Sequence, residues 1–119
     1  DTLPFNAGTT ASDALWAGVP VLTCPGEAFA SRMAASLLHA VGLPELITHG
    51  LEEYEALALK LATSPAQLAD IRAKLARNRT THPLFDTDRY RRHLESAYLT
   101  MWERAQRGDG PASFDVKPD

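Results

Sequence analysis

The residues best suited to chemistry in this chain are Gly8, Thr9, Thr10 and Asp13. The sequence after Gly8 favours a helix, and the first amides of a helix lack intrahelical acceptors and carry partial positive charge. A phosphate fits at such a helix end. Glycine allows the backbone to approach it closely, and the two threonine hydroxyls can donate to its oxygens. The carboxylate one turn later can accept hydrogen bonds from a ribose diol.

A second interpretation of the same residues needs no ligand. Thr10 and Asp13 also fit a capping box, in which the carboxylate of the later residue bonds back to the amide of the earlier one. The local sequence leaves both interpretations open, because a Gly-Thr-Thr turn by itself is weak evidence for a ligand.

The elements that must position these residues alternate between helix and strand patterns. Residues 2–8 predict a loop, 10–17 and 28–41 predict helices, and the apolar runs 19–24 and 43–48 predict short strands. This alternation is typical of the α/β class, with a parallel sheet on whose carboxyl edge ligands bind. One or two strands cannot form an open parallel sheet alone, so we expect further strands upstream.

The carboxyl-terminal half predicts helices only. Apolar spacing indicates a helix over 52–62, and Ser64-Pro65-Ala66-Gln67 predicts a capping box that opens a helix to about Arg79. Asp86 or Thr87 is expected to cap a last helix. Aromatic and apolar side chains are expected to be core rather than part of a cofactor site; they are Trp16, Tyr90, Leu94, Ala97, Tyr98, Met101 and Trp102.

Composition excludes several classes of protein. The 119 residues are 45% hydrophobic and 23% charged, which fits a globular protein, and the net charge of −3 argues against a nucleic-acid partner. No apolar run approaches the roughly 18 residues of a membrane span, and no signal peptide is visible. The single cysteine, Cys24, favours a cytoplasmic location, and the four scattered histidines predict no metal site.

A longer pattern favours the ligand interpretation of the threonine pair. The segment 5–32, FNAGTTASDALWAGVPVLTCPGEAFASR, closely resembles the donor-binding region of the protein O-N-acetylglucosamine transferase family, which includes the SPINDLY proteins. The resemblance continues through ELI, EEYEALALKLA, PLFDT and YLTMWE and covers nearly the whole chain. It implies an inverting glycosyltransferase of the GT-B fold, in which two Rossmann-like domains face each other across a cleft.

This resemblance assigns parts to the chain. Residues 1–48 are expected to be part of the Rossmann-like domain that binds the nucleotide sugar, 49–107 its carboxyl-terminal helices, and 108–119 a loosely ordered tail. Thr9 and Thr10 match the family positions that bond the donor diphosphate. Asp13 matches the carboxylate that holds the ribose hydroxyls.

The resemblance also names weaker candidates and one departure. Gly8 stands where the animal enzymes and many bacterial relatives have a histidine, while SPINDLY-like members also have glycine. Glu27 is a possible sugar contact, or else a charge that pairs with a helix dipole. Asn6 either touches the sugar or serves as a turn residue.

The resemblance implies transfer of N-acetylglucosamine from UDP-N-acetylglucosamine to serine or threonine hydroxyls of proteins. Two alternatives remain: fucose transfer from GDP-fucose, as in SPINDLY, and a non-catalytic interaction module derived from a GT-B half. A Rossmann dehydrogenase is disfavoured because the chain lacks G-x-G-x-x-G.

The expected partners are the nucleotide sugar, a protein or peptide acceptor, and the upstream remainder of the catalytic region, to which the family commonly adds tetratricopeptide repeats. We expect no cofactor, no metal, no nucleic acid and no membrane. None of the histidines suits a general base, so no catalytic residue is assigned and the chain alone is expected to be inactive.

Overall fold

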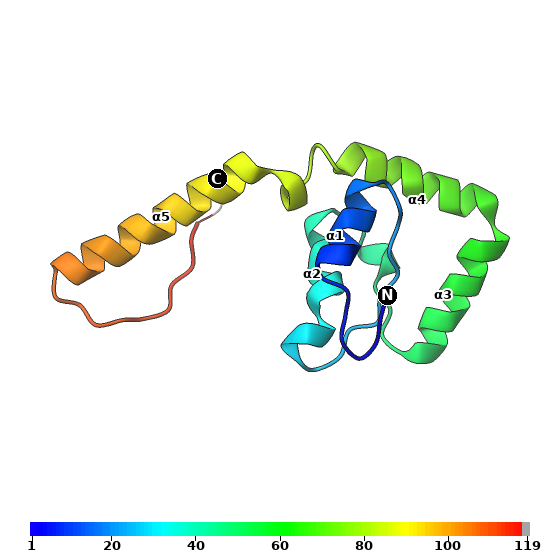
Figure 1. Cartoon of the computed structure of the whole chain (residues 1–119), viewed down its shortest axis with the longest axis horizontal. Coiled ribbons are helices and arrows are strands. Elements are labelled where there is room, and N and C mark those ends of the chain that lie inside the picture. The colour runs from blue at the N-terminus through cyan, green and yellow to red at the C-terminus, as the bar shows by residue number, and fades with distance from the viewer. Residues whose placement is uncertain (118–119) are drawn as a thin grey trace. The chain divides into compact units, whose positions relative to one another are not determined.

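The computed structural model describes residues 1–117, which fall into two units: Asp1–Phe85, and a second unit that begins at Asp86. The described residues contain five α-helices and three 3-10 helices, and Figure 1 shows them joined by loops, with no strand. Their one strand-like contact is an isolated parallel bridge between Thr23 and Ile47. Over the same residues, no helix combines the length and the apolar character needed to cross a membrane.

The prediction of an α/β class, with a parallel sheet of Rossmann type, is therefore wrong for this chain as far as the structure describes it. The predicted strands 19–24 and 43–48 pair only around Thr23, whose backbone donates to the second segment over 3.0 Å and accepts from it over 2.9 Å. Pro44 begins a 3-10 helix, η2 (Pro44–Leu46), which takes up half of the second segment. Only Ile47 and Thr48 of this segment follow η2, and the ladder stops after one bridge.

The first helix agrees closely with its prediction. α1 (Thr9–Trp16) begins one residue earlier than expected, and Gly18 follows its end with φ +81°, a conformation that suits glycine. Ala11 and Leu15 are its buried residues and lie four positions apart, hence on one face. This narrow apolar stripe fixes which side of α1 points to solvent.

The second predicted helix, 28–41, is broken into two pieces. A 3-10 helix, η1 (Phe29–Ser31), is followed by Arg32 at φ −119° and ψ 0°, and α2 (Met33–Ala40) begins after it. The Ser31 hydroxyl donates to the carbonyl of Ala28 over 2.8 Å, so the side chain stabilises a tight local turn in place of a longer helix.

The core of the first unit lies between α1, α2 and the later helices. Leu15 from α1 meets Leu38 of α2, and apolar residues from η2 and its approach complete one buried cluster. α4 contributes Leu75, which is fully buried. The cluster consists of Leu15, Leu38, Val41, Leu43, Leu46 and Leu75.

Two further helices close this unit. α3 (Leu51–Thr63) is rich in Leu, Ala and Glu, which are strong helix formers, and it buries none of its residues within the described chain. α4 (Pro65–Asn78) begins with proline at its first position, as predicted. The predicted capping box at Ser64 is wrong, because its side chain makes no capping hydrogen bond in the part of the chain that the structure describes.

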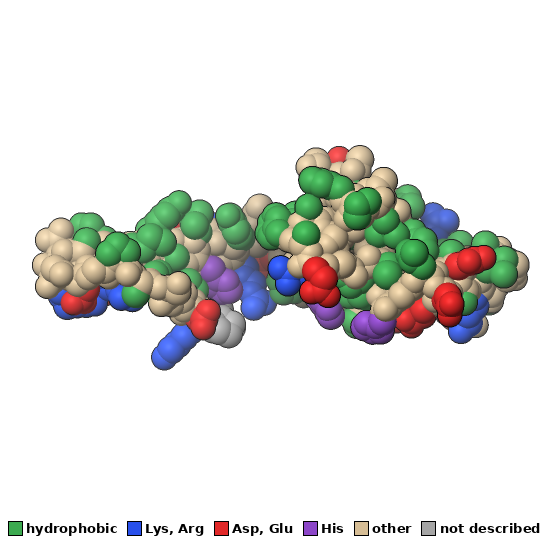
Figure 2. All heavy atoms as spheres, turned by 90° about the horizontal axis from the view of Figure 1, so that it is seen from below, with side chains coloured by type: hydrophobic (Ala, Val, Ile, Leu, Met, Phe, Trp, Pro, Cys, Tyr) green, Lys and Arg blue, Asp and Glu red, His purple; other side chains and the backbone are tan. Residues whose placement is uncertain are grey.

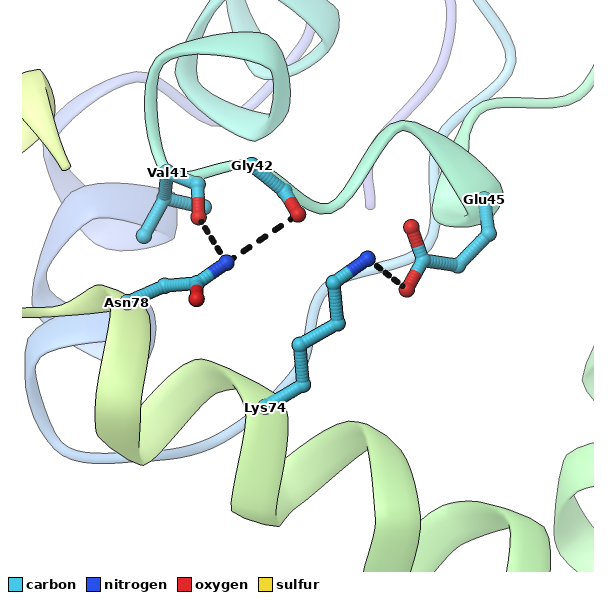
Figure 3. A network of polar contacts seen from close by, with 5 residues as sticks. All are labelled: Val41, Gly42, Glu45, Lys74 and Asn78. Atoms are coloured by element: carbon cyan, nitrogen blue, oxygen red, sulfur yellow. Dashed lines mark hydrogen bonds and ion pairs between the residues drawn. The ribbon is translucent and has the colours of Figure 1, made fainter.

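α4 is tied to the end of α2 by the buried side chain of Asn78. Figure 3 shows its Nδ2 directed at two carbonyls, that of Val41 at 2.9 Å and that of Gly42 at 3.1 Å. Val41 is the C-cap residue of α2 and Gly42 follows it, so neither carbonyl has a partner within the helix. Beside them, Lys74 Nζ pairs with Glu45 Oε1 at 2.7 Å, at the surface.

The expectation that Trp16 belongs to the core is wrong, because 56% of its surface is exposed. The Phe85 ring meets it edge-on with centroids 5.0 Å apart, and the Arg79 guanidinium lies 5.2 Å from the indole centroid. Arg79 also donates to the Trp16 carbonyl. The indole therefore covers the surface between α1 and α4, with a cation over its face.

The second unit consists of α5 (Thr87–Gln106) and the residues after it. The Asp86 carboxylate accepts from the Arg89 amide over 2.9 Å, so of the two predicted caps, Asp86 and Thr87, the helix uses Asp86. Arg91 and Glu95 form an ion pair one turn apart on its surface.

The predicted core stripe of α5 is wrong: none of its residues is buried within the described chain, and Figure 2 shows hydrophobic side chains gathered along this unit. The large exposed hydrophobic residues of α5 are Tyr90, Leu94, Tyr98, Leu99, Met101 and Trp102.

Replacing Gly42 by alanine is expected to lower the free energy of unfolding of the first unit by about 2–4 kcal/mol. Gly42 has φ +71°, and a Cβ there would lie 2.5 Å from the His82 ring and 2.8 Å from Asn78 Nδ2. The alanine is therefore strained and also displaces the amide that caps α2. Urea denaturation followed by Trp16 fluorescence, in a Trp102→Phe background, measures the loss.

The matched control for this substitution is Gly18→Ala. Gly18 has a similar φ of +81° but nothing within 4 Å of its Cβ position, so only the backbone strain of about 1–2 kcal/mol remains. Equal losses for the two variants would show that the contact with His82 and Asn78 contributes nothing.

Candidate functional site

The start of α1 presents unpaired amides. Gly8 occupies the position just before the helix, and its carbonyl accepts from the Ser12 amide over 3.0 Å. Within residues 1–117, the structure gives no acceptor for the amides of Thr9, Thr10 and Ala11. Three N–H groups and the positive end of the helix dipole therefore meet at one point.

The capping-box interpretation of Thr10 and Asp13 is wrong. Thr10 is the second residue inside the helix, not the residue that caps it. No side chain among the described residues makes a capping hydrogen bond at this end of α1. Asp13 is therefore not held by the helix start and is available to a ligand.

The polar residues of α1 share its outer face. Thr9 and Asp13 are four residues apart and Thr10 and Asp13 three, so all three side chains lie on neighbouring positions of the helix surface. All three are exposed, while Ala11 and Leu15 on the opposite side pack into the core. The fold thus brings together the four residues singled out from the sequence, since Gly8 directly precedes them.

The loop that leads into α1 is held by Asp1, an aspartate that the sequence analysis did not single out. Asp1 Oδ1 accepts from the Ala7 amide over 2.8 Å and from the Thr2 amide over 2.7 Å. Its Oδ2 accepts from the Thr23 hydroxyl over 2.6 Å. A local Asp-Thr turn is visible in the sequence, but the partner 22 residues away is not.

Asn6 lies inside this loop, with 1% of its surface exposed. Its amide donates to the Ala30 carbonyl over 2.9 Å, and its side-chain Nδ2 donates to the Thr2 carbonyl over 3.2 Å. Its Oδ1 is buried and has no partner among the described residues. These contacts account for Asn6 as a loop residue, and its contact with a sugar stays a prediction.

Glu27 is one of the residues that line an open pocket of about 690 Å³. The side chain is exposed, and Cys24 and Phe5 are among the residues that line the same pocket. The wall is largely apolar, and Gly8, Thr9, Thr10 and Asp13 are not part of it. The loop 1–8 borders both the pocket and the helix start, because Phe5 lines the pocket and Gly8 directly precedes α1.

Comparisons with known proteins identify the family of this chain. The model of glycosyl transferase family 41 matches residues 1–94. The chain is 44% identical over 117 residues to the probable UDP-N-acetylglucosamine–peptide N-acetylglucosaminyltransferase SEC of Arabidopsis thaliana, covering 98% of this chain and 12% of that protein. It is 42% identical over 108 residues to the UDP-N-acetylglucosamine–peptide N-acetylglucosaminyltransferase of Caenorhabditis elegans, covering 91% of this chain and 9% of that protein.

A solved structure extends the likeness to three dimensions. The chain superposes on a mutant of the Thermobaculum terrenum O-GlcNAc transferase with a TM-score of 0.82 at 40% sequence identity. This match covers 91% of the present chain and 21% of the solved chain. The chain therefore spans about a tenth of the two curated relatives and a fifth of the solved one.

A side chain at position 8 is expected to be tolerated. Gly8 has φ −95°, and a Cβ there would meet only the Met33 methyl group, at 3.7 Å. Gly8→His should therefore change the free energy of unfolding by less than about 1 kcal/mol, as measured by urea denaturation.

Gly26→Ala is the contrasting variant. A Cβ on Gly26 would lie 2.8 Å from Ser31 Oγ and 3.1 Å from Ser31 Cβ, inside the tight turn of η1. We expect a loss of about 1–3 kcal/mol for this smaller substitution. A larger loss for Gly8→His than for Gly26→Ala would contradict the space assigned to position 8.

Proposed function

Because the chain belongs to glycosyl transferase family 41, we propose that it is the segment of a glycosyltransferase that binds the diphosphate and ribose of the donor. The observation that carries the proposal is the start of α1. There, three unpaired amides, two exposed threonine hydroxyls and an unengaged carboxylate lie on one solvent-facing surface. A diphosphate needs donors and positive potential, and a ribose diol needs an acceptor, so the two parts of a nucleotide match the two parts of this surface.

UDP-N-acetylglucosamine is the donor that we propose. The relatives from Arabidopsis thaliana and Caenorhabditis elegans are both named for this donor. GDP-fucose is the alternative, which the SPINDLY-like glycine at position 8 favours. In this proposal the residues of α1 contact neither the uracil nor the guanine base. The choice between the two donors must therefore depend on other contacts.

The proposed reaction is a direct displacement at the anomeric carbon by a serine or threonine hydroxyl of a protein acceptor. The bond from the anomeric carbon to the β-phosphate oxygen breaks, its electron pair stays on that oxygen, and the sugar configuration inverts. Negative charge therefore grows on the diphosphate in the transition state. Fixed amides and hydroxyls at the start of α1 bind this charge more strongly than they bind the ground state, which lowers the barrier.

The amides require no rearrangement to act in this way. They are held by the helix itself, and Ala11 and Leu15 anchor that helix in the core. Preorganised donors of this kind account for a large part of many enzymatic rate enhancements. We assign no general base to this chain, and the group that accepts the hydroxyl proton is proposed to lie elsewhere in the protein.

One observation favours a second function, a non-catalytic module that docks a partner. α5 exposes aromatic and apolar side chains along its length, and exposed apolar surface commonly marks an interaction site. The two functions differ in their ligand. Calorimetric titration of the full-length protein with UDP should show binding if the chain holds a donor, and no binding if it is only a docking module.

Thr10→Ala in the full-length protein is expected to lower turnover with UDP-N-acetylglucosamine by about a hundredfold or more. The fall in UDP affinity should be smaller, because the hydroxyl acts mainly on the charge that develops as the glycosidic bond breaks. A steady-state assay of transfer to an acceptor peptide gives the turnover, and calorimetry gives the UDP dissociation constant.

Thr10→Ser is the matched control, since serine keeps the hydroxyl and removes only a methyl group. It should retain most of the turnover. If Thr10→Ser and Thr10→Ala lose turnover equally, the hydroxyl is not the active group, and unchanged turnover in both variants would refute the assigned role of Thr10.

Asp13 is proposed to accept hydrogen bonds from the ribose hydroxyls, and a double comparison tests this directly. Asp13→Ala should weaken binding of UDP by about 10- to 100-fold, the effect of losing hydrogen bonds to a charged group. The same substitution should leave binding of 2′,3′-dideoxy-UDP nearly unchanged, because that nucleotide lacks both hydroxyls. Equal losses for the two nucleotides, measured by calorimetry, would instead indicate a general electrostatic or structural effect.

A further inference from the structure

We propose that Asp1 and Thr23 form a positioning pair that fixes the loop in front of α1, and that donor affinity depends on this pair although neither side chain touches the donor. The inference rests on the proposed function of the α1 start. It assigns a role to the carboxylate of Asp1, which is not among the proposed donor contacts Thr9, Thr10 and Asp13. Its basis is a set of hydrogen bonds that connects the loop to the core.

The carboxylate of Asp1 holds the backbone immediately before the proposed phosphate site. Asp1 Oδ1 accepts from the Ala7 amide over 2.8 Å, and Ala7 directly precedes Gly8. A charged acceptor makes a stronger hydrogen bond than a neutral one, so this contact is well suited to hold a loop. The position and orientation of the Gly8 peptide therefore depend on where the Asp1 carboxylate is fixed.

Thr23 supplies the fixed point. Its side chain is completely buried, and its hydroxyl donates to Asp1 Oδ2 over 2.6 Å. Its backbone amide donates to the Leu46 carbonyl over 3.0 Å, and its carbonyl accepts from the Thr48 amide over 2.9 Å. Leu46 belongs to the buried core cluster. The loop is thus linked to the core through Asp1 and Thr23.

A second anchor holds the other side of the same loop. The Asn6 amide donates to the Ala30 carbonyl over 2.9 Å, next to η1. Two adjacent residues of the loop are therefore held by separate parts of the fold. Asn6 is bonded to Ala30, and Ala7 is bonded to Asp1, which Thr23 holds in turn. Releasing the Asp1 contact frees the residue nearest the helix start, while the Asn6 contact keeps the loop folded.

This arrangement predicts a loss of function without loss of the fold. The proposed donor contacts act through geometry, and a displacement of about 1 Å at a reacting group can reduce the rate by about a hundredfold. Weakening the Asp1–Thr23 pair should therefore loosen the backbone that the diphosphate approaches. The amides of α1 itself stay in place, so the expected effect on binding is partial.

The test compares two buried threonines in the full-length protein. Thr23 and Thr48 are both fully buried, and each makes one hydroxyl hydrogen bond: Thr23 to Asp1, and Thr48 to the Thr23 carbonyl over 2.9 Å. Valine has the same shape and removes only the hydroxyl. In Thr48→Val the Thr23 carbonyl keeps the Thr48 amide, so the link to the loop is intact.

We expect Thr23→Val to raise the UDP dissociation constant about tenfold and Thr48→Val to change it by less than about twofold, although both variants lose a comparable amount of stability in urea. Calorimetry and denaturation on the same preparations give both quantities. Equal changes in UDP affinity for the two variants, or no change in either, would overturn the proposal.

Substitutions of Asp1 provide a rescue test. Asparagine can still accept from the Ala7 amide, and its Nδ2 can donate to the Thr23 hydroxyl, which accepts after rotation. Asp1→Asn should therefore stay within about threefold of the unmodified UDP affinity, while Asp1→Ala should weaken it about tenfold or more. Equal effects of Asn and Ala would contradict a positioning role.

These outcomes separate this inference from the proposed function. If the unmodified protein binds UDP and Thr10→Ala impairs turnover, but Thr23→Val binds UDP as tightly as Thr48→Val, only the positioning pair is wrong. If the unmodified protein does not bind UDP at all, the proposed function is wrong and the positioning pair falls with it.

Discussion

The backbone hydrogen bonds around Thr23 connect the parts of the first unit that matter for the proposed site. These bonds join residues 19–24 to the core beside Leu46. The Thr23 hydroxyl also donates to Asp1, and this contact links the core to the loop before α1. A single parallel bridge is a weak element by itself. Here Thr23 is fully buried, and leaving a buried backbone group unpaired costs free energy. These hydrogen bonds are therefore strongly favoured in the folded chain.

The start of α1 has the opposite character, since its first three amides are unpaired within residues 1–117 and two of the residues that carry them, Thr9 and Thr10, are exposed. Water can satisfy such amides at little cost, and a phosphate that replaces the water meets donors already aligned by the helix. The residues that stabilise this short helix and those proposed to bind the donor thus lie on different faces. Ala11 and Leu15 hold it in the core, while Thr9, Thr10 and Asp13 face outward.

Other helices depend less on burial. α3 and α5 bury none of their residues within the described chain, so local terms must hold them: Leu, Ala and Glu content in α3, and the Asp86 cap with the Arg91–Glu95 pair in α5. Local terms of this size are marginal for isolated helices. The exposed apolar side chains of α5 are therefore the surface of this unit best suited to further packing.

The sequence alone determined the features that depend on near neighbours: the helix that follows Gly8, its end at Gly18, the proline start of α4, a cap of α5 at Asp86 or Thr87, and the group formed by the threonine pair with Asp13. Only the tertiary structure decided the features that depend on distant partners. The pattern of residues 19–24 predicts a strand. In the structure these residues form a single bridge, because their partner segment is interrupted by η2. The capping box failed because the helix begins one residue before Thr10. Asp1 gained its role from a hydroxyl 22 residues away, and no local pattern encodes a contact at that separation.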